Sequence, residues 1–178
     1  MSNLRISVLK REEQEKFYDQ ILKMLIISDK DFCPPLSMRS STTQADFTQQ
    51  QTSVDGIQSY FEEMKKQRFA AAYDGDQLLG FVSFKENYVS PEIGEDDLPN
   101  IYLSTLIVSP EARGKGITYS IYENLFDTYK NSNIFTRTWS TNISHTRILS
   151  KFGFELFKTI KDDRGKGIDT VYFRKNKE

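Results

Sequence analysis

Glycines and basic residues form a short turn between two apolar segments of the chain. The turn spans Arg113–Gly116, with an apolar segment at 101–108 before it and an amphipathic segment at 116–130 after it. Glycines permit a tight turn that leaves backbone N–H groups free. The first N–H groups of a helix also lack internal partners and lie at its positive end. This order of elements predicts a site for phosphate or pyrophosphate, where Arg113 and Lys115 add positive charge.

The same four residue types, Arg-Gly-Lys-Gly, occur a second time at 164–167. That copy lies between two strand-like segments and no helical pattern follows it, so it predicts a hairpin turn. Neither copy matches the Walker A pattern or the dinucleotide-binding pattern G-x-G-x-x-G. The prediction of a phosphate site at 113–116 therefore depends on the strand before the turn and the helix after it.

The residue counts exclude several other kinds of site. The chain has one cysteine, Cys33, and one histidine, His145. These cannot form an intramolecular disulfide or an ordinary zinc site, and the G-x-S-x-G motif of many hydrolases is absent. We therefore expect no metal.

Charge and hydropathy argue against two classes of partner. The 24 basic and 25 acidic residues give a net charge of -1, which is unlike a general nucleic-acid binder. No apolar run approaches the ~20 residues of a membrane span, and the N-terminus lacks the apolar segment of a secretory signal. We expect a cytoplasmic protein with neither a membrane nor a nucleic acid as partner.

The rest of the chain must position the turn at 113–116. Its hydrophobic periodicity predicts eleven helices and strands. The predicted strands are 4–9, 68–73, 78–85, 101–108, 134–140, 154–160 and 170–174. The predicted helices are 11–28, one that begins near Ser53 or Asp55, 116–130 and 142–151. This order and the length of 178 residues predict one α/β domain over 1–178. It would hold a mixed sheet of about seven strands with helices on both faces.

The strand at 101–108 is apolar on both faces, which is typical of a strand buried at the centre of a sheet. Simple alternation divides its residues into two sets. Ile101, Leu103 and Ile107 would face one side, and Tyr102, Leu106 and Val108 the other.

Two polar segments allow more than one interpretation. Residues 29–52 form a long polar stretch, which is either a functional loop or a partly ordered connector. The loop at 92–97 is acidic, with Glu92, Glu95, Asp96 and Asp97. It either attracts a cationic substrate or is an ordinary solvated loop.

The turn resembles motif A of the GCN5-related N-acetyltransferases, the GNAT family. That motif is R/Q-x-x-G-x-G/A, and here it is Arg113-x-x-Gly116-x-Thr118. The segment from Asn142 to Phe154 resembles the family's motif B, in which an Asn precedes a helix and Gly-Phe begins the next strand. The predicted order of elements also agrees with the family fold along nearly the whole chain. The resemblance implies a bulged fourth strand and a V-shaped opening between strands four and five.

The resemblance implies acetyl-CoA as the donor substrate and assigns residues to it. The backbone of Leu106, Ile107 and Val108 would pair with the pantetheine arm. The backbone N–H groups of Arg113, Gly114, Lys115, Gly116, Ile117, Thr118 and Tyr119 would hold the pyrophosphate. Asn142 would reach the pantetheine amide, serve as a helix N-cap, or do both.

The catalytic residues are less complete than the binding residues. Many relatives carry Glu where this chain has Ser104, and Tyr where it has Leu149. Ser104 is kept as a candidate catalytic residue because of this position, although a hydroxyl alone is not a useful base. The N–H near Val108 would stabilise the developing oxyanion. His145 has an ordinary pKa near neutrality and lies one helical turn before Leu149, so we hypothesise that it acts as acid or base. The alternative for His145 is a packing residue near the helix cap.

These observations lead to one main hypothesis and two alternatives. The main one is an N-acetyltransferase that acts on a primary amine of a small molecule, a peptide N-terminus or a lysine. The acidic loop slightly favours a cationic acceptor, and a homodimer is compatible with the sequence. The first alternative is a catalytically impaired acyl-CoA-binding sensor or interaction module. The second is an unrelated anion-binding domain with no preference for CoA over ATP.

Overall fold

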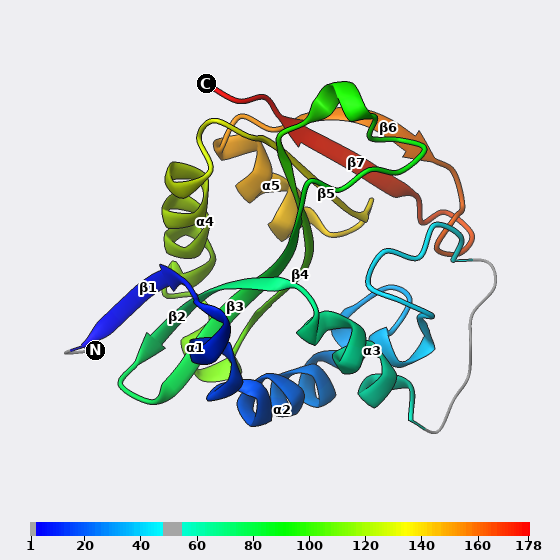
Figure 1. Cartoon of the computed structure of the whole chain (residues 1–178). Helices are drawn as coiled ribbons and strands as arrows, with labels where there is room; N and C mark the ends of the chain where they lie inside the picture. Colours follow the sequence, from blue (N-terminus) through cyan, green and yellow to red (C-terminus); the bar gives the residue numbers. More distant parts are fainter. Residues whose placement is uncertain (1–2, 48–54) are drawn as a thin grey trace.

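The computed structural model describes residues 3–47 and 55–178. Over these residues the chain forms seven strands and five α-helices (Figure 1). The strands are β1 (Leu4–Val8), β2 (Arg68–Asp74), β3 (Gln77–Glu86), β4 (Asn100–Val108), β5 (Asn133–Trp139), β6 (Glu155–Ile160) and β7 (Thr170–Lys175). The helices are α1 (Arg11–Glu15), α2 (Tyr18–Ser28), α3 (Gly56–Lys65), α4 (Ile117–Thr128) and α5 (Ile143–Lys151).

The strands form one mixed sheet in the order β1-β2-β3-β4-β5-β7-β6. β4 and β5 pair in parallel, and the other neighbours pair antiparallel. Figure 1 shows α4 and α5 on one side of the sheet and α2 and α3 on the other. The predicted α/β class, with a mixed sheet of seven strands and helices on both faces, is confirmed.

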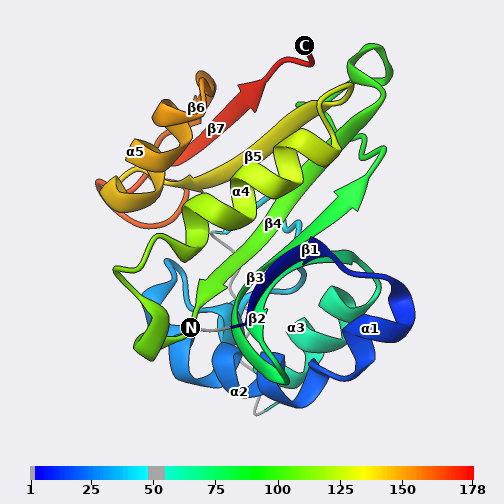
Figure 2. The same cartoon turned by 90° about the vertical axis from the view of Figure 1, so that its left-hand side faces the viewer.

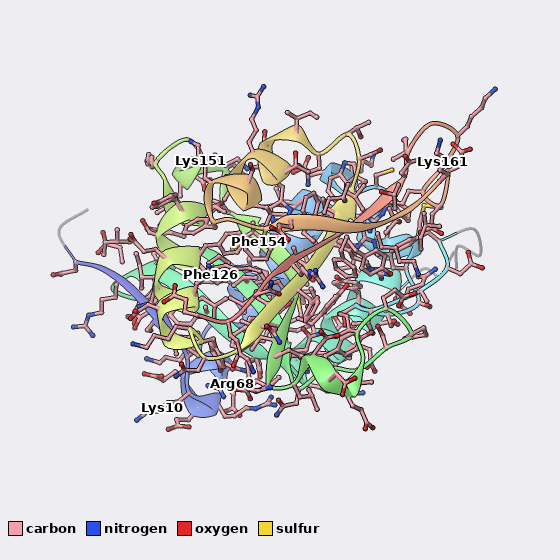
Figure 3. All side chains as sticks on the ribbon, turned by 90° about the horizontal axis from the view of Figure 1, so that it is seen from above. Lys10, Arg68, Phe126, Lys151, Phe154 and Lys161 are labelled. Atoms are coloured by element: carbon pink, nitrogen blue, oxygen red, sulfur yellow. The ribbon has the colours of Figure 1, made fainter. Side chains whose placement is uncertain are left out.

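The first core lies between the sheet and the helices α4 and α5. The predicted stripe of α4 recurs every four residues, which places Ile117, Ile121 and Leu125 on its buried face. Phe126 of the same helix meets Phe154 at a ring-centroid distance of 5.4 Å, between α4 and the sheet (Figure 3). Burying each large apolar side chain contributes roughly 1.5–3 kcal/mol. This packing fixes α4 against the sheet.

The second core lies on the opposite face, where α2 and α3 pack on the sheet. Ile21 and Leu25 of α2 and Tyr60 and Met64 of α3 are buried there against Phe81 of β3. The helical residues among them recur at intervals of four, which places them on one face of each helix. The two cores together bury both faces of the strands that carry the site.

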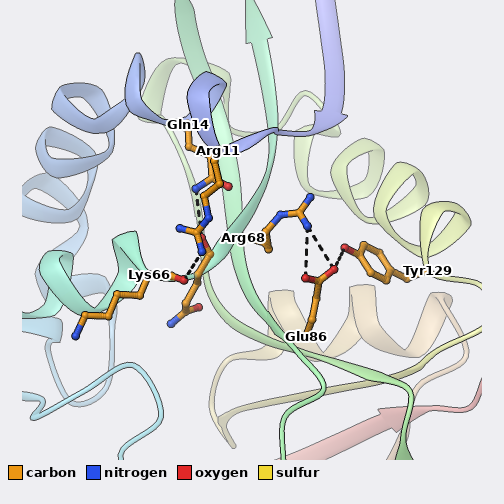
Figure 4. Close-up of polar contacts among 7 residues, drawn as sticks. Arg11, Gln14, Lys66, Arg68, Glu86 and Tyr129 are labelled. Atoms are coloured by element: carbon orange, nitrogen blue, oxygen red, sulfur yellow. Dashed lines mark hydrogen bonds and ion pairs between the residues drawn. The ribbon is translucent and has the colours of Figure 1, made fainter.

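The predicted single helix over 11–28 is wrong, because the structure divides it into α1 and α2. The first five residues carry a polar sequence that has no apolar stripe, and they dock through polar side chains instead. Arg11 donates hydrogen bonds to the backbone oxygens of Lys65 and Lys66 at 2.9 and 2.7 Å (Figure 4). Gln14 donates to the backbone oxygen of Gln67. The apolar stripe begins at Phe17, which is buried, and from there α2 follows the second core.

A polar cluster ties the C-terminal end of α4 to the sheet. Tyr129 donates a 2.6 Å hydrogen bond to Glu86 at the end of β3, and Glu86 forms an ion pair with Arg68 of β2 (Figure 4). Because this end of α4 is anchored, the position of its N-terminal end relative to β4 is set as well.

β4 contains a bulge that changes which side chains share a face. Ser83 of β3 pairs with Thr105 while its neighbour Phe84 pairs with Leu103, so Ser104 is the extra residue. Beyond the bulge, the side chains of Leu106 and Val108 face the first core with Leu103 and Ile101, and Ile107 faces the second core. The alternation predicted from sequence is therefore wrong after Ser104, because one inserted residue exchanges the two faces.

β4 and β5 pair only over Asn100–Leu103 and Asn133–Thr136. Beyond Leu103 no described strand pairs with this edge of β4, and β4 and β5 separate (Figure 2). The V-shaped opening that the resemblance implies is confirmed. It begins at the bulge, because both Ser104 and the loss of pairing occur at the same point of β4.

Candidate functional site

The opening between β4 and β5 contains a cavity of about 450 Å³. Its walls come from Leu103–Val108 of β4 and Thr136–Trp139 of β5, together with the N-terminal turns of α4 and α5. Residues of the long polar stretch, including Phe32 and Arg39, close it on the side of the second core. Residues 48–52 of that stretch, and Ser53, lie outside the described residues.

The free edge of β4 presents backbone groups to the cavity. Ser109 donates its N–H to the backbone oxygen of Leu79 in β3 at 2.8 Å. Groups alternate along an antiparallel strand, so Ile107 also turns its N–H and C=O toward β3. Leu106 and Val108 consequently turn theirs toward the cavity. Of the three residues assigned by resemblance, Leu106 and Val108 can pair with an extended ligand, and Ile107 is also part of the cavity wall.

The glycine turn has the geometry that its sequence predicts. Gly114 and Gly116 have φ angles of 73° and 75°, and α4 begins directly after them. Ser120 is the first residue of α4 whose N–H reaches a backbone oxygen, that of Gly116 at 3.0 Å. Within the described chain, the N–H groups of Ile117, Thr118 and Tyr119 donate to no backbone oxygen. A short row of free N–H groups thus lies at the positive end of a helix.

The two cations of the turn differ in their contacts. Arg113 donates to the backbone oxygen of Val108 at 3.3 Å and forms a 3.0 Å ion pair with Asp31. Both partners of this ion pair are about half exposed, so it contributes less than ~1 kcal/mol and an anionic ligand can displace it. Lys115 is exposed. Thr118 lines the cavity, and it occupies the position where the family motif has Gly or Ala.

Asn142 is the N-cap of α5 and lines the cavity. Its Oδ1 accepts the N–H of His145 at 3.4 Å, and its Nδ2 donates to Thr138 at 3.0 Å. The predicted capping role is confirmed. A contact with the pantetheine amide stays a prediction.

His145 and Tyr122 meet at the junction of α5 and α4. The His145 Nε2 and the Tyr122 hydroxyl are 2.8 Å apart, and both residues line the cavity. Leu149, one helical turn after His145, is buried in the first core. Burial lowers the pKa of His145 to about 4 and raises that of Tyr122. At neutral pH the pair is therefore an uncharged imidazole beside a protonated phenol.

Tyr122 is absent from the predicted site residues, although the sequence contains a signal for it. Tyr122 follows Thr118 by four residues, so the two share a face of α4. The apolar stripe of α4 contains its neighbour Ile121 instead. A search for packing residues therefore does not identify the adjacent face of the helix, where Tyr122 lies.

The lowered pKa of His145 predicts how stability changes with pH. When the pKa of a histidine is lower in the folded state than its unfolded value of ~6.5, its contribution to the free energy of unfolding is fully present above pH 6.5. This contribution is lost as the pH falls toward 4. His145 is the sole histidine of the sequence, so the effect can be assigned to it. Between pH 7.5 and pH 5 we expect wild type to lose about 2 kcal/mol more than His145→Gln, measured by urea unfolding at each pH. Equal losses in the two proteins would contradict a depressed pKa at this position.

Ser104, the bulged residue, is held by hydrogen bonds. Its hydroxyl lies 2.5 Å from Gln67 Oε1, 3.1 Å from the Ser83 carbonyl oxygen and 2.9 Å from the Ser83 hydroxyl. Gln67 in turn donates to Thr42 at 2.6 Å. Ser104 lines the cavity, yet a hydroxyl in this network is not a base for an amine. Its place in the reaction stays a prediction.

Sequence reasoning missed three arginines of the cavity wall. Arg39 comes from the long polar stretch, Arg137 from β5 and Arg164 from the second Arg-Gly-Lys-Gly segment. That segment is a turn between β6 and β7, as predicted, but Arg164 reaches inward and is only 5% exposed. The recurrence of the tetrapeptide could have drawn attention to it.

The acidic loop does not contribute to this site. Its residues Glu92, Glu95, Asp96 and Asp97 are absent from the cavity wall, and Glu92 instead forms an ion pair with Lys158. The loop therefore gives no support to a cationic acceptor.

Metal-binding and membrane-spanning features are both absent from the described part of the chain. No group of three or more His, Cys, Asp or Glu residues within 3–47 and 55–178 is arranged to hold a metal ion. Over the same residues, none of the helices has the length and apolar character needed to cross a membrane.

Comparisons with known proteins agree with this architecture. The model of the acetyltransferase (GNAT) family matches residues 35–154. An N-acetyltransferase from Staphylococcus aureus Mu50 superimposes with a TM-score of 0.64 at 18% identity, covering 98% of each chain. The ribosomal-protein-alanine N-acetyltransferase of Brucella melitensis gives a TM-score of 0.63 at 16% identity, covering 97% of this chain and 99% of that one.

A third solved structure contains a ligand. The Salmonella typhimurium protein yncA, solved with its cofactor acetyl-CoA, gives a TM-score of 0.64 at 12% identity. The match covers 98% of this chain and 94% of that one. No curated protein sequence matches the chain.

Proposed function

Because this chain belongs to the GNAT family of acetyltransferases, we propose that it transfers an acetyl group from acetyl-CoA to a primary amine. The observation that carries the proposal is one cavity that joins two unsatisfied sets of backbone groups. These are the N–H groups of Leu106 and Val108 with the C=O of Leu106 on the edge of β4, and the free N–H groups at the start of α4, where Thr118 lines the cavity. We further propose that residues 1–178 form a single acyltransferase domain.

The two sets of backbone groups fit two parts of acetyl-CoA. The N–H groups of Ile117, Thr118 and Tyr119 suit a pyrophosphate, since anions bind at helix N-termini. The N–H and C=O groups of Leu106 and the N–H of Val108 suit the amides of a pantetheine arm, which would lie along β4 like an added strand, while the C=O of Val108 accepts from Arg113. When bound, the donor supplies an acetyl thioester.

The chain's own groups then assist the transfer. A neutral amine forms the new C–N bond at the thioester carbon, and the C–S bond breaks. The N–H of Val108, directed into the cavity, would donate to the carbonyl oxygen while negative charge develops there. The amine proton would leave through water, because no carboxylate of the described wall residues except Asp31 lines the cavity and Asp31 pairs with Arg113.

Tyr122 and His145 would supply the proton to the departing thiolate. The phenol is protonated at neutral pH, and the neutral imidazole can donate its Nε2–H to the phenol oxygen. This donation lowers the cost of leaving negative charge on Tyr122. In this arrangement Tyr122 is the proton donor and His145 stabilises it, which differs from the hypothesis that His145 itself acts as acid or base; that hypothesis stays a prediction.

The second candidate function is an acyl-CoA-binding sensor or interaction module. The hydrogen-bonded Ser104 favours it, because no carboxylate stands at the position where many relatives have Glu. Both candidates require acetyl-CoA binding, and turnover distinguishes them.

Melting curves and thiol release test the proposed function in the same samples. A ligand at 100 times its dissociation constant adds ~2.7 kcal/mol, which raises the melting temperature of a chain this size by roughly 5–10 °C. We expect this rise with acetyl-CoA and CoA and not with ATP, and thiol release with at least one amine. A rise without release across a broad amine panel would favour the sensor. No rise with either CoA species would overturn the proposal.

A further inference from the structure

Three guanidinium groups converge on the side of the cavity closed by the long polar stretch. Arg39 and Arg164 are 9% and 5% exposed, Arg137 is half-buried, and all three line the cavity. They come from three distant parts of the chain. They are distinct from the turn and α4 N-terminus proposed for the pyrophosphate, where the cation is Arg113.

The hydrogen-bond partners of this arginine cluster are neutral groups. Arg39 donates to the backbone oxygens of Pro34 and Cys33, at 3.0 and 3.5 Å. Arg164 donates to the backbone oxygen of Cys33 at 2.7 Å and to the Thr170 hydroxyl at 2.9 Å.

Arg137 completes this set of neutral contacts. It donates to the backbone oxygen of Gln44 and to the Tyr172 hydroxyl. Across the described ranges, none of the three guanidinium groups forms an ion pair with a carboxylate.

Aromatic packing holds the cluster in place. The ring of Phe47 has the guanidinium carbons of Arg39, Arg137 and Arg164 at 5.3, 4.8 and 4.2 Å from its centroid. The ring of Trp139 lies 5.8 Å from Arg164. Such contacts orient the planar groups before a ligand arrives, which reduces the entropy lost on binding.

Electrostatics make an anion favourable at this position. Burial, followed by the nearby charges of Arg39 and Arg137, lowers the pKa of Arg164 to about 9. Asp163 is the carboxylate that acts against this effect, and it accepts a hydrogen bond from Thr170. Buried charges normally require a counter-charge. The protein provides three cations here against the single carboxylate of Asp163, and we expect a ligand to supply further negative charge.

We propose that the arginine cluster binds an anionic oxyacid group, carboxylate or phosphate, on a small amine acceptor. The inference rests on the proposed function and specifies its acceptor class. Guanidinium groups match the geometry of carboxylate and phosphate oxygens through paired N–H donors. Because the cluster is buried within the cavity, the anionic group must enter with the amine. A small amino acid or amino phosphate meets this requirement, and a polyamine does not.

Matched acceptors test the proposal on the wild-type protein. Thiol release is measured with amino acids, with their methyl esters and amides, with phosphorylated amines such as phosphoethanolamine, and with polyamines. We expect kcat/KM to be at least ~30-fold higher for the best free acid or phosphate than for its uncharged counterpart. The kcat/KM values of the carboxylate-bearing and phosphate-bearing amines then show which anionic group is preferred. Equal or better use of esters, amides or polyamines would overturn the proposal while leaving the transferase intact.

A binding measurement separates this proposal from failure of the proposed function. The protein is first saturated with CoA, so that the pyrophosphate site is filled, and is then titrated with succinate or inorganic phosphate. We expect either anion to raise the melting temperature of wild type, and the effect to be lost in Arg137→Gln and weakened in Arg137→Lys. Arg174→Gln on the neighbouring strand β7, whose side chain is outside the cavity wall, should behave as wild type.

The outcomes are distinguishable even if no acceptor is turned over. Anion stabilisation that depends on Arg137 supports the cluster as an anion site when thiol release is absent, and the transferase proposal alone would then fail. Absence of anion stabilisation in wild type, or equal stabilisation of the Arg137→Gln variant, overturns the proposal. If Arg137→Gln does not fold, Arg137→Lys keeps the positive charge, and its stabilisation by anions is compared with that of wild type.

Discussion

Substituting Tyr122 with Phe is expected to lower kcat for acetyl transfer by about 100-fold or more. The substitution removes one oxygen, which is the proposed proton donor to the thiolate, and positioned acids usually contribute 10²–10⁴-fold. The dissociation constant for acetyl-CoA should change less than about 3-fold, because the backbone groups of β4 and α4 remain. Pre-steady-state thiol release and a separate binding titration measure the two quantities.

Tyr129→Phe is the matched control for this substitution. Tyr129 lies on the chain directly after α4, and its hydroxyl donates to Glu86, outside the cavity wall. Both substitutions remove a hydrogen-bonded phenol oxygen, and each should cost about 1–3 kcal/mol of stability. We expect kcat to fall for Tyr122→Phe alone. Similar kcat values for both variants and wild type would exclude Tyr122 as the acid.

His145→Gln then separates the two members of the pair. The Gln amide can still donate a hydrogen bond to the Tyr122 oxygen, so activity should fall less than in Tyr122→Phe. If His145→Gln instead loses as much kcat as Tyr122→Phe, then the imidazole itself transfers the proton.

The sequence predicted the elements of this fold well because their signals are local. The stripe that begins at Ile117 and the glycine turn before it depend on spacing within a few residues, and both are present as expected. The V-shaped opening was inferred from resemblance alone. The faces of β4 after Ser104 were assigned incorrectly, since simple alternation was counted through the position of the bulge that the resemblance implied.

The arginine cluster shows why the part of the cavity proposed for the acceptor could not be predicted from the sequence. Arg39, Arg137 and Arg164 are separated by 98 and 27 positions, counted from their residue numbers, and come together only in the folded chain. Each sits in a segment that reads as polar loop, strand or turn, where a charged residue is ordinarily solvated. Their shared burial, which the sequence does not show, is the observation from which the proposed anion site follows.

Substituting Gly116 with Val is expected to weaken acetyl-CoA binding by at least about 100-fold. Gly116 has a φ of 75°, a conformation that a β-branched residue almost never adopts, so the turn must change. The free N–H groups of Ile117–Tyr119 would then lose their common direction toward the pyrophosphate. Isothermal titration with acetyl-CoA measures the loss, and kcat/KM should fall in parallel.

Gly75→Val distinguishes loss of the pyrophosphate site from a general effect of strain. Gly75 has a φ of 59° in the turn between β2 and β3, and, as at Gly116, an added Cβ would contact no atom within 4 Å. The two variants should therefore lose similar stability, because the backbone strain is of the same kind. Only Gly116→Val should lose acetyl-CoA, since Gly116 directly precedes the free N–H groups of α4 whereas Gly75 lies in the turn between β2 and β3. Equal affinity in both variants would mean that the donor does not depend on this turn, and the pyrophosphate assignment would be wrong.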